Sequence, residues 1–270
     1  MSSHPRDISS HDLEAMLELT PHREALRELV ACGREHIGFF PAHNPRALEY
    51  PWVLANMPAQ LAGVRILDVG AGVNPLPFAL AQRGARVVTV DNHPLQRDPG
   101  QRGQWNEWGF LDYSQVDGRI ASLHVAYEES PDSMTFDCIY SVSVIEHVPC
   151  VVRKAWAHKF AAQLATGGML LLTVDLSPGT DFLWNLSEGR VVEPAVVHGE
   201  LSSLSDELEA AGFAVEPASV QRKIPDSRVN KCRFEYDDLK WAFHETFKSH
   251  IDYALKDKVL NTQWFVELTQ

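Results

Sequence analysis

The chain has 270 residues, of which 45% are hydrophobic, and a formal charge of −12 at pH 7. This length allows one large domain with additions. The acidic balance argues against a nucleic acid partner, because phosphate binding needs clustered Lys and Arg, and it favours a small, cationic ligand. The polar start MSSHPRDISSHD is not typical of a signal peptide, and the longest apolar stretch, Met169 to Val174, is too short to span a bilayer. We therefore expect a cytoplasmic protein with no membrane partner.

The cysteines and histidines show no metal-binding pattern. Four cysteines, at positions 32, 138, 150 and 232, form no C-x-x-C pair, so the sequence predicts reduced thiols, mostly in the core, and neither a disulfide framework nor a zinc knuckle. The twelve histidines form no H-E-x-x-H or other compact ligand motif. These residues alone therefore predict no metal site.

In chain order, residues 1–63 have the pattern of helices. Apolar side chains recur at three- and four-residue spacing, at Leu13, Met16, Leu17, Leu26, Leu29, Val30 and Ile37. Thr20 and Pro21 fit the N-cap and first position of a helix. Pro51 interrupts the segment 46–52, RALEYPW, so two short helices are expected there. We interpret residues 1–63 as an N-terminal helical extension that forms a lid.

From residue 64, short apolar runs alternate with helical patterns, which is typical of crossover units around a mainly parallel sheet. The expected strands are 64–69, 86–90, 120–125, 136–142, 168–174, 213–220 and 263–268. The helices expected after the fourth, fifth and sixth strands are 151–164, 201–211 and 238–255. The pattern predicts one α/β domain over 64–270 with an insertion near 177–200. It does not decide whether the last strand is parallel or antiparallel.

A loop with two glycines follows the first strand in the stretch ILDVGAGVNP. Gly70 and Gly72 let a ligand approach the backbone, although turns after strands also use glycine for structural reasons. Asp68 would repel a pyrophosphate but suits an ammonium or sulfonium charge. Pro75 stands where a dinucleotide fingerprint has Gly or Ala, and Asp91 after the second strand can accept hydrogen bonds from ribose hydroxyls. The loop therefore favours a cationic nucleoside over a dinucleotide.

Four motifs in order complete a resemblance to a known family. They are ILDVGAG, Asp91, FDCIYSVSVIEHV at 136–148 and LATGGMLLLTVD at 164–175, with AAGFAV trailing at 210–215. On these residues the sequence resembles class I S-adenosylmethionine-dependent methyltransferases. The resemblance implies S-adenosylmethionine as the cofactor and a doubly wound, mainly parallel, seven-stranded Rossmann-like α/β sheet. It also implies that the last strand is antiparallel.

The resemblance further implies a set of cofactor contacts. In chain order these are Asp68 near the amino group, Gly70, Ala71 and Gly72 under the methionine portion and ribose, Asp91 at the ribose hydroxyls, Asn92 and Ala126 at the adenine, and backbone groups of Ser141 and Val142 at the amino acid end. Val125 stands where many relatives carry an acid that binds the adenine amine. The counterpart here is the Ala126 backbone or Glu128. The segment 92–111 replaces the usual short helix, and the sequence does not explain it.

Methyl transfer from a sulfonium is an in-line displacement, so alignment and water exclusion can supply most of the rate and a catalytic side chain is optional. A neutral acceptor can still need a base. The candidates are His147, Asp175 and, if the N-terminal helices cover the site, Tyr50. In many relatives the Glu146-His147 pair is a structural element, and in some quinone-pathway methyltransferases it suggests a metal role. These alternatives stay open.

Aromatic side chains are a second resource, because a sulfonium is attracted to a ring face. Tyr50, Trp52 and Trp184 stand where a lid or acceptor pocket could use them, although core packing is the simpler interpretation, above all for Trp52. The insertion 177–200 and the N-terminal helices are the expected walls of the acceptor pocket.

Three functions fit these observations. The first is methyl transfer to O or N of a small molecule of specialised metabolism, because no N-P-P-Y or D-P-P-Y loop follows the fourth strand, where residues 140–143 read YSVS. The second is another displacement on the same cofactor, either ring closure or aminocarboxypropyl transfer. The third is a non-catalytic cofactor sensor. The expected partner is a small-molecule acceptor, and the protein is expected to be a monomer or homodimer.

Overall fold

The structure is a computed structural model that describes residues 10–20, 22–41, 46–176, 183, 186–187, 190–191, 198–213, 220–223 and 262–269. Its main sheet has the strand order β3-β2-β1-β4-β5-β9-β8. The strands are β1 (Arg65–Val69), β2 (Arg86–Val90), β3 (Ile120–Leu123), β4 (Phe136–Val142), β5 (Leu164–Leu176), β8 (Val220–Lys223) and β9 (Thr262–Thr269). Strands β1 to β5 are parallel, and β9 is antiparallel to both β5 and β8. The expected doubly wound, mainly parallel sheet is confirmed.

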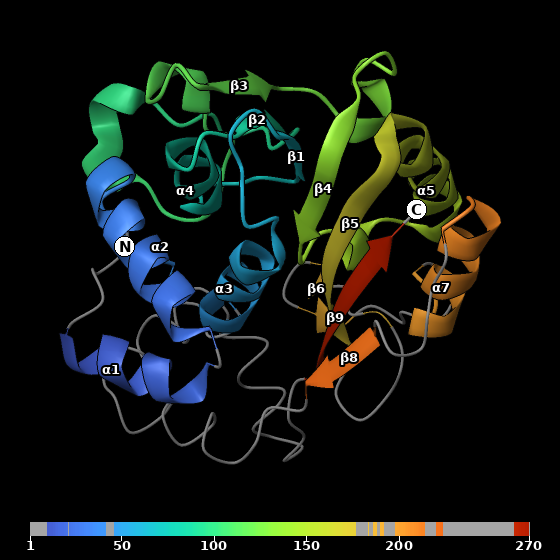
Figure 1. The fold of residues 1–270 in the computed structure, drawn as a ribbon, viewed down its shortest axis with the longest axis horizontal. Coiled ribbons are helices and arrows are strands. Elements are labelled where there is room, and N and C mark those ends of the chain that lie inside the picture. The colour runs from blue at the N-terminus through green and yellow to red at the C-terminus, as the bar shows by residue number, and fades with distance from the viewer. Residues whose placement is uncertain are drawn as a thin grey trace.

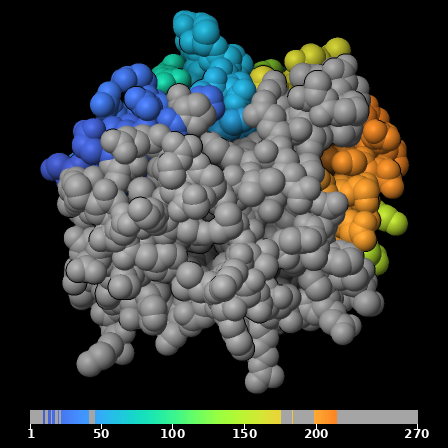
Figure 2. Space-filling model, turned by 90° about the horizontal axis from the view of Figure 1, so that it is seen from below, coloured from blue at the N-terminus to red at the C-terminus, as the bar shows by residue number. Residues whose placement is uncertain are grey.

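Helices cover both faces of this sheet (Figure 1). They are α1 (Ser10–Leu19), α2 (Arg23–His36), α3 (Arg46–Asn56), α4 (Leu76–Gln82), α5 (Cys150–Gln163) and α7 (Leu201–Ala210), with short 3-10 turns η1 (Pro99–Gln104), η2 (Tyr113–Gln115), η3 (Tyr127–Glu129) and η4 (Ile145–His147). α2, α3 and α4 lie on one side, and α5 and α7 lie on the other (Figure 1). Figure 2 shows the same separation from below, with the blue N-terminal helices and the orange α7 at opposite sides.

Alternate residues of β1 and β5 serve two hydrophobic cores. On β1, Ile66 packs with α2, α3 and α4, whereas Leu67 packs with α5 and α7. On β5, Leu171 joins the first core and Leu170 the second. Both faces of a parallel strand are buried in this way, which explains why these strands read as continuous apolar runs.

The N-terminal helices differ from the prediction in two places. α3 is one helix with Pro51 inside it, so the expectation of two short helices is wrong. Eight of its residues, from Ala47 to Leu54, are buried, and this packing keeps the helix continuous although Pro51 cannot donate a backbone hydrogen bond. α2 begins at Arg23 after an N-cap at His22, not at Thr20, whose hydroxyl accepts the His22 N–H (3.3 Å).

Most strand boundaries agree with the prediction to within two residues, and two strands differ by more. β5 begins at Leu164 rather than at residue 168, and it pairs with β4 from Phe136↔Leu164 onward through an irregularity. The strand predicted at 213–220 is described only from Val220, while Phe213 is a buried residue directly after α7. The helix predicted at 238–255 and Trp184 lie outside the described residues. In the insertion, β6 (Leu186–Ser187) pairs antiparallel with β7 (Arg190–Val191).

Cys32, Cys138 and Cys150 are free thiols, and Cys232 lies outside the described residues. Burial raises the pKa of Cys32 to about 12 and that of Cys138 to about 11, so both stay protonated at neutral pH. Among the described residues, no helix has the length and apolarity needed to cross a membrane.

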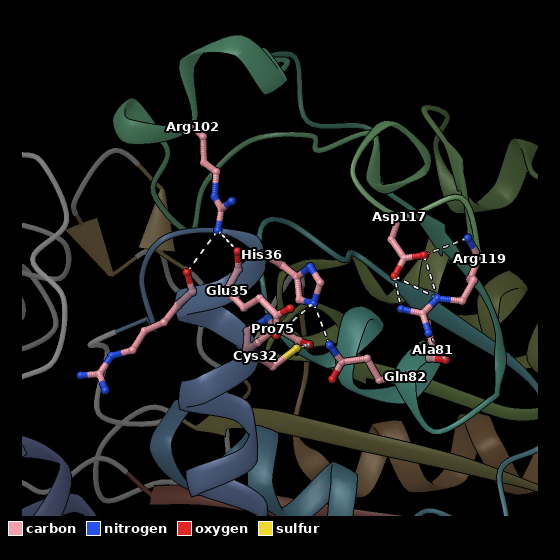
Figure 3. A network of polar contacts seen from close by, with 10 residues as sticks. Cys32, Glu35, His36, Pro75, Ala81, Gln82, Arg102, Asp117 and Arg119 are labelled. Atoms are coloured by element: carbon pink, nitrogen blue, oxygen red, sulfur yellow. Dashed lines mark hydrogen bonds and ion pairs between the residues drawn. The ribbon is translucent and has the colours of Figure 1, made fainter.

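Arginines tie loops to the C-terminal ends of two helices (Figure 3). The Arg102 guanidinium reaches the carbonyl oxygens of Arg34 (3.1 Å) and Glu35 at the end of α2. Arg119 donates to the Ala81 carbonyl of α4 (3.3 Å) and is paired with Asp117. Cationic side chains at helix C-termini satisfy carbonyl groups that have no partner within the helix. These contacts fix the loops after β2 and before β3 against α2 and α4.

Candidate functional site

The strand order reverses between β1 and β4, and a cavity of about 320 Å³ lies at their carboxyl ends. Ligands bind at this switch point in doubly wound sheets, because the crossovers leave to opposite faces and open a crevice there. The cavity is lined by the loop after β1, the start of the segment after β2 together with residues 107–109, the segment after β3, the loop after β4, one face of α3, and Trp156 of α5. The expected site residues from Asp68 to Gly72, with Asp91, Asn92 and Val142, are among the lining residues.

The glycine loop has no backbone donor left for a phosphate. Each N–H from Gly70 to Leu76 donates to a protein acceptor, apart from Pro75, which has none. The acceptors are Val90 O for Gly70 and Ala71, Asp91 Oδ2 for Gly72, Glu107 O for Val73, the Tyr113 hydroxyl for Asn74, and Asn74 Oδ1 for Leu76. Phosphate-binding loops work by pointing free N–H groups at the anion. This loop is therefore built for a ligand that approaches without a phosphate.

Both loop glycines have left-handed backbones, with φ of 75° at Gly70 and 55° at Gly72. A Cβ at Gly70 would lie 2.4 Å from a methyl group of Val144, and a Cβ at Gly72 would lie 3.0 Å from the Glu107 carbonyl oxygen. A side chain at Gly70 is therefore excluded by conformation and by space together.

Asp68, at the end of β1, is 2% exposed and lines the cavity. Its Oδ2 accepts hydrogen bonds from the Tyr140 hydroxyl (2.9 Å) and from Asn74 Nδ2 (3.3 Å). Burial raises the pKa of this carboxyl to about 7, against the opposing effect of the two hydrogen bonds. A nearby positive charge would favour the ionised form, so Asp68 and a cationic ligand stabilise each other.

The side chain of Asp91, directly after β2, already accepts two hydrogen bonds from backbone N–H groups. Its Oδ2 accepts from Gly72 N (2.8 Å) and its Oδ1 from His93 N (2.7 Å). Each carboxylate oxygen has a second lone pair, so the fixed side chain can still accept hydrogen bonds from a diol. Asn92 lies beside it in the cavity lining.

The wall beyond Asp91 is apolar and aromatic. Val125, Tyr127 and Trp156 line it, whereas Ala126 is not among the lining residues. Glu128 accepts a hydrogen bond from Trp156 Nε1 (3.0 Å) outside the lining, so it supports the aromatic wall. These rings suit a flat base, and no acidic side chain from this segment faces the cavity.

At the end of β4, the chain turns sharply. The Ser141 hydroxyl donates to Val69 O (2.8 Å), so its fully buried side chain joins β4 to β1 rather than lining the cavity. Val142 and Ser143 do line the cavity. Ser143 has a φ of 49°, which is uncommon for a residue with a side chain and is typical of strained functional turns.

Helix α3 supplies lining residues that sequence reasoning missed. Arg46 is the one Arg or Lys that lines the cavity among the described residues, and its Nη1 donates to Glu49 Oε2 (2.6 Å). Glu49 is completely buried, and its Oε1 accepts from the hydroxyls of Ser143 (2.6 Å) and Thr173 (2.7 Å). The i, i+3 spacing of Arg46 and Glu49 was a visible signal of a shared helix face. Their place over β4 and β5 was not visible in the sequence.

The three catalytic candidates have different surroundings. His147 lines the cavity from η4, and its side chain is 43% exposed. Tyr50 lines the cavity from α3, and burial raises the pKa of its hydroxyl well above the usual range, so it keeps its proton. Asp175 pairs in register with Gln263 of β9, and its side chain lies outside the described part of the structure. Trp52 is 6% exposed and belongs to the core below α3, not to the cavity lining.

Glu146 is fully buried next to His147, with 3.9 Å between Oε1 and Nε2. Within the described residues, no three His, Cys, Asp or Glu side chains are grouped closely enough to hold a metal ion.

The fold and the cavity define a doubly wound α/β protein with a site for a nucleoside that carries positive charge. A family model described as a methyltransferase domain matches residues 34–218. The chain therefore belongs to this methyltransferase family, and the expected class, which uses S-adenosylmethionine, is confirmed at the level of the family.

Curated relatives match part of the chain. A ubiquinone biosynthesis O-methyltransferase from Pseudomonas fluorescens is 32% identical over 111 residues, which are 41% of this chain and 44% of that protein. The enzyme of the same name from Xanthomonas euvesicatoria is 34% identical over 138 residues, 49% of this chain and 51% of its own length. The chain thus spans about half the length of the curated relatives that it matches.

Among solved structures, an S-adenosylmethionine-dependent methyltransferase from Mesorhizobium loti superposes with a TM-score of 0.52. Its sequence identity is 17%, and the match covers 82% of this chain and 97% of that one. This similarity shows a shared fold.

Proposed function

We propose that this protein transfers a methyl group from S-adenosylmethionine to an oxygen or nitrogen atom of a small acceptor, in specialised metabolism. The observation that supports this most is the glycine loop whose N–H groups are all bonded within the protein. That loop rejects a pyrophosphate, while Asp68 and Asp91 beside it suit a cationic nucleoside. The names of the curated relatives favour oxygen as the acceptor atom.

The residues of the cavity fit this cofactor in their proposed roles. Asp91 holds the ribose hydroxyls, and Tyr127 and Trp156 contact the adenine ring. Asp68 faces the positively charged part of the ligand, and Arg46 faces its carboxylate. When bound, the cofactor supplies an electrophilic methyl group on a positively charged sulfur. The protein contributes alignment and exclusion of water, for which α3 is the proposed lid.

A base is needed only if the acceptor must lose a proton. His147 is the proposed base, because it combines a place in the lining with partial exposure. Tyr50 is better suited to donate a hydrogen bond, since its hydroxyl holds its proton. The expected small-molecule acceptor would enter between α3 and the loop after β4; most of the insertion predicted to form the other wall, 177–200, lies outside the described residues.

Calorimetry with S-adenosylhomocysteine tests the cofactor assignment. The wild-type protein is expected to bind S-adenosylhomocysteine and not NAD. Asp91→Asn is expected to lower the affinity for S-adenosylhomocysteine by on the order of tenfold to a hundredfold, because charge-assisted hydrogen bonds are lost. Exposed Glu209 of α7 offers a matched control in Glu209→Gln, which should bind as the wild type does. NAD binding without S-adenosylhomocysteine binding would overturn the proposal.

Incubation with S-adenosylmethionine separates the possible reactions. S-adenosylhomocysteine that forms only when an acceptor is added supports methyl transfer. Methylthioadenosine formed without any acceptor would instead support ring closure, and methylthioadenosine that needs an acceptor would support aminocarboxypropyl transfer. Tight binding without turnover over a broad acceptor screen would support a sensor.

A further inference from the structure

The segment 92–111 forms a fixed wall of the cavity. Gln96 and Phe110 make a β-bridge that closes the segment on itself. Trp105 is 2% exposed, and its Nε1 donates to the Asp98 carbonyl (2.8 Å). A segment with a buried anchor and its own backbone pairing holds its side chains in defined positions.

A contact with α2 holds the same segment from outside. Figure 3 shows Arg102 extending from it to the carbonyl group of Glu35 at the end of the helix, and the same guanidinium donates to the Arg34 carbonyl. The position of the wall is therefore coupled to the N-terminal helices as well as to the sheet.

This anchoring brings Glu107 to the glycine loop. Its carbonyl oxygen accepts from Val73 N (3.2 Å) and lies against Gly72. Glu107 also lines the cavity, together with Arg46 and Tyr50 of α3. Glu107 thus contacts the glycine loop through its backbone and lines the same cavity as helix α3.

The carboxylate of Glu107 has hydrogen-bonding capacity that the described protein does not use. Its Oε2 is buried and has no hydrogen-bond partner among the described residues. Arg46, the nearby cation, is paired with Glu49 at 2.6 Å. Burial raises the pKa of Glu107 to about 7, and the positive charge of Arg46 opposes this shift. A buried carboxylate oxygen without a partner is costly, so a ligand that donates a hydrogen bond to it gains affinity.

We propose that Glu107 binds the α-ammonium group at the amino acid end of S-adenosylmethionine, an inference that rests on the proposed function. Asp91 and the aromatic wall place the nucleoside at one end of the cavity, so the amino acid end faces α3. There, Arg46 and Glu107 offer opposite charges to a zwitterion. Asp68 Oδ2 already accepts two protein hydrogen bonds, whereas the buried Glu107 Oε2 accepts none from the described residues.

The test compares two ligands that differ by the amino group. Calorimetry measures S-adenosylhomocysteine and its deamino analogue on the wild type, on Glu107→Gln and on the control Glu209→Gln. The wild type and the control are expected to prefer S-adenosylhomocysteine by on the order of tenfold to a hundredfold, the contribution of a hydrogen bond between charged groups. Glu107→Gln is expected to lose most of this preference, while its affinity for the deamino analogue stays close to that of the wild type.

The preference is the ratio of two dissociation constants measured on the same variant. A fraction of unfolded protein affects both measurements alike and leaves this ratio unchanged. If Glu107→Gln does not fold, as judged by circular dichroism, Glu107→Asp replaces it with the same expected direction. An unchanged preference with no loss of affinity for either ligand overturns the inference and assigns Glu107 to the acceptor. Equal weakening of both ligands also overturns it and assigns Glu107 to loop structure. Failure of the wild type to bind S-adenosylhomocysteine contradicts the proposed function itself.

Discussion

The two sides of the cavity are built from residues at very different distances along the chain. On the β1 side, Asp68 and Asn74 bond to each other across only six positions of one loop. On the α3 side, Glu49 bonds to Ser143 and Thr173, which are 94 and 124 positions away. The first side is a contiguous motif that can be recognised in a sequence. The second side exists only after α3 has packed over the ends of β4 and β5.

The largest expected effect is on the α3 side, in Glu49→Ala. Removing this carboxylate breaks the ion pair with Arg46 and takes an acceptor away from the hydroxyls of Ser143 and the buried Thr173. Breaking a buried ion pair costs about 3 to 5 kcal/mol, so the free energy of unfolding should fall by that amount in denaturant titration. Glu49→Gln is the matched control, because its amide oxygen can still accept from both hydroxyls, and it should lose clearly less. Equal losses in the two variants would show that charge alone, and not the shared acceptor, holds α3 in place.

On the β1 side, the buried carboxyl group of Asp68 is expected to make the free energy of unfolding depend on pH. The folded pKa of Asp68 is about 7, above the usual value of 3.8. The unfolded chain therefore binds fewer protons between these values, and the stability of the protein falls as pH rises from about 4 to 7. In Asp68→Asn this contribution is absent, so the difference in unfolding free energy between wild type and variant should change across that window by a few kcal/mol and stay constant outside it. A constant difference from pH 4 to 8 would contradict the raised pKa.

A smaller effect on stability is expected from two glycine variants. They separate the cost of a left-handed backbone from the cost of a steric clash in the glycine loop. Gly70→Ala adds a left-handed alanine and a contact of 2.4 Å with Val144. Gly63→Ala adds a left-handed alanine with nothing within 4 Å, at a φ of 82°. Each should lose about 1 to 2 kcal/mol for the backbone in thermal unfolding, and Gly70→Ala should lose more and also bind S-adenosylhomocysteine less tightly. Equal stability losses would show that Val144 moves away at no cost.

Much of the β1 side could be predicted, because its chemistry is local. The order of strands and glycines placed Asp68, Gly70 and Asp91 at one edge of the sheet, and the structure brings these residues together around the cavity. Ser141 and Ala126 were predicted to contribute backbone groups; neither is among the lining residues, whereas the neighbouring Val142 and Val125 are. Which residues face the cavity depends on where a strand ends and its turn begins, and element boundaries are the part of a fold that a sequence predicts least well.

The sequence by itself determined the class of fold, the family and the glycine loop, because strand periodicity and short motifs depend on neighbours in the chain. Two residues of the sequence, Asp68 and Pro75, also argued against a phosphate ligand. Only the tertiary structure decided that Arg46 and Tyr50 line the cavity, that Glu49 holds α3 over the sheet, and that the unexplained segment 92–111 brings Glu107 to the cavity. The physical reason is that burial and hydrogen-bond satisfaction depend on contacts between distant segments, which arise only when the chain has packed.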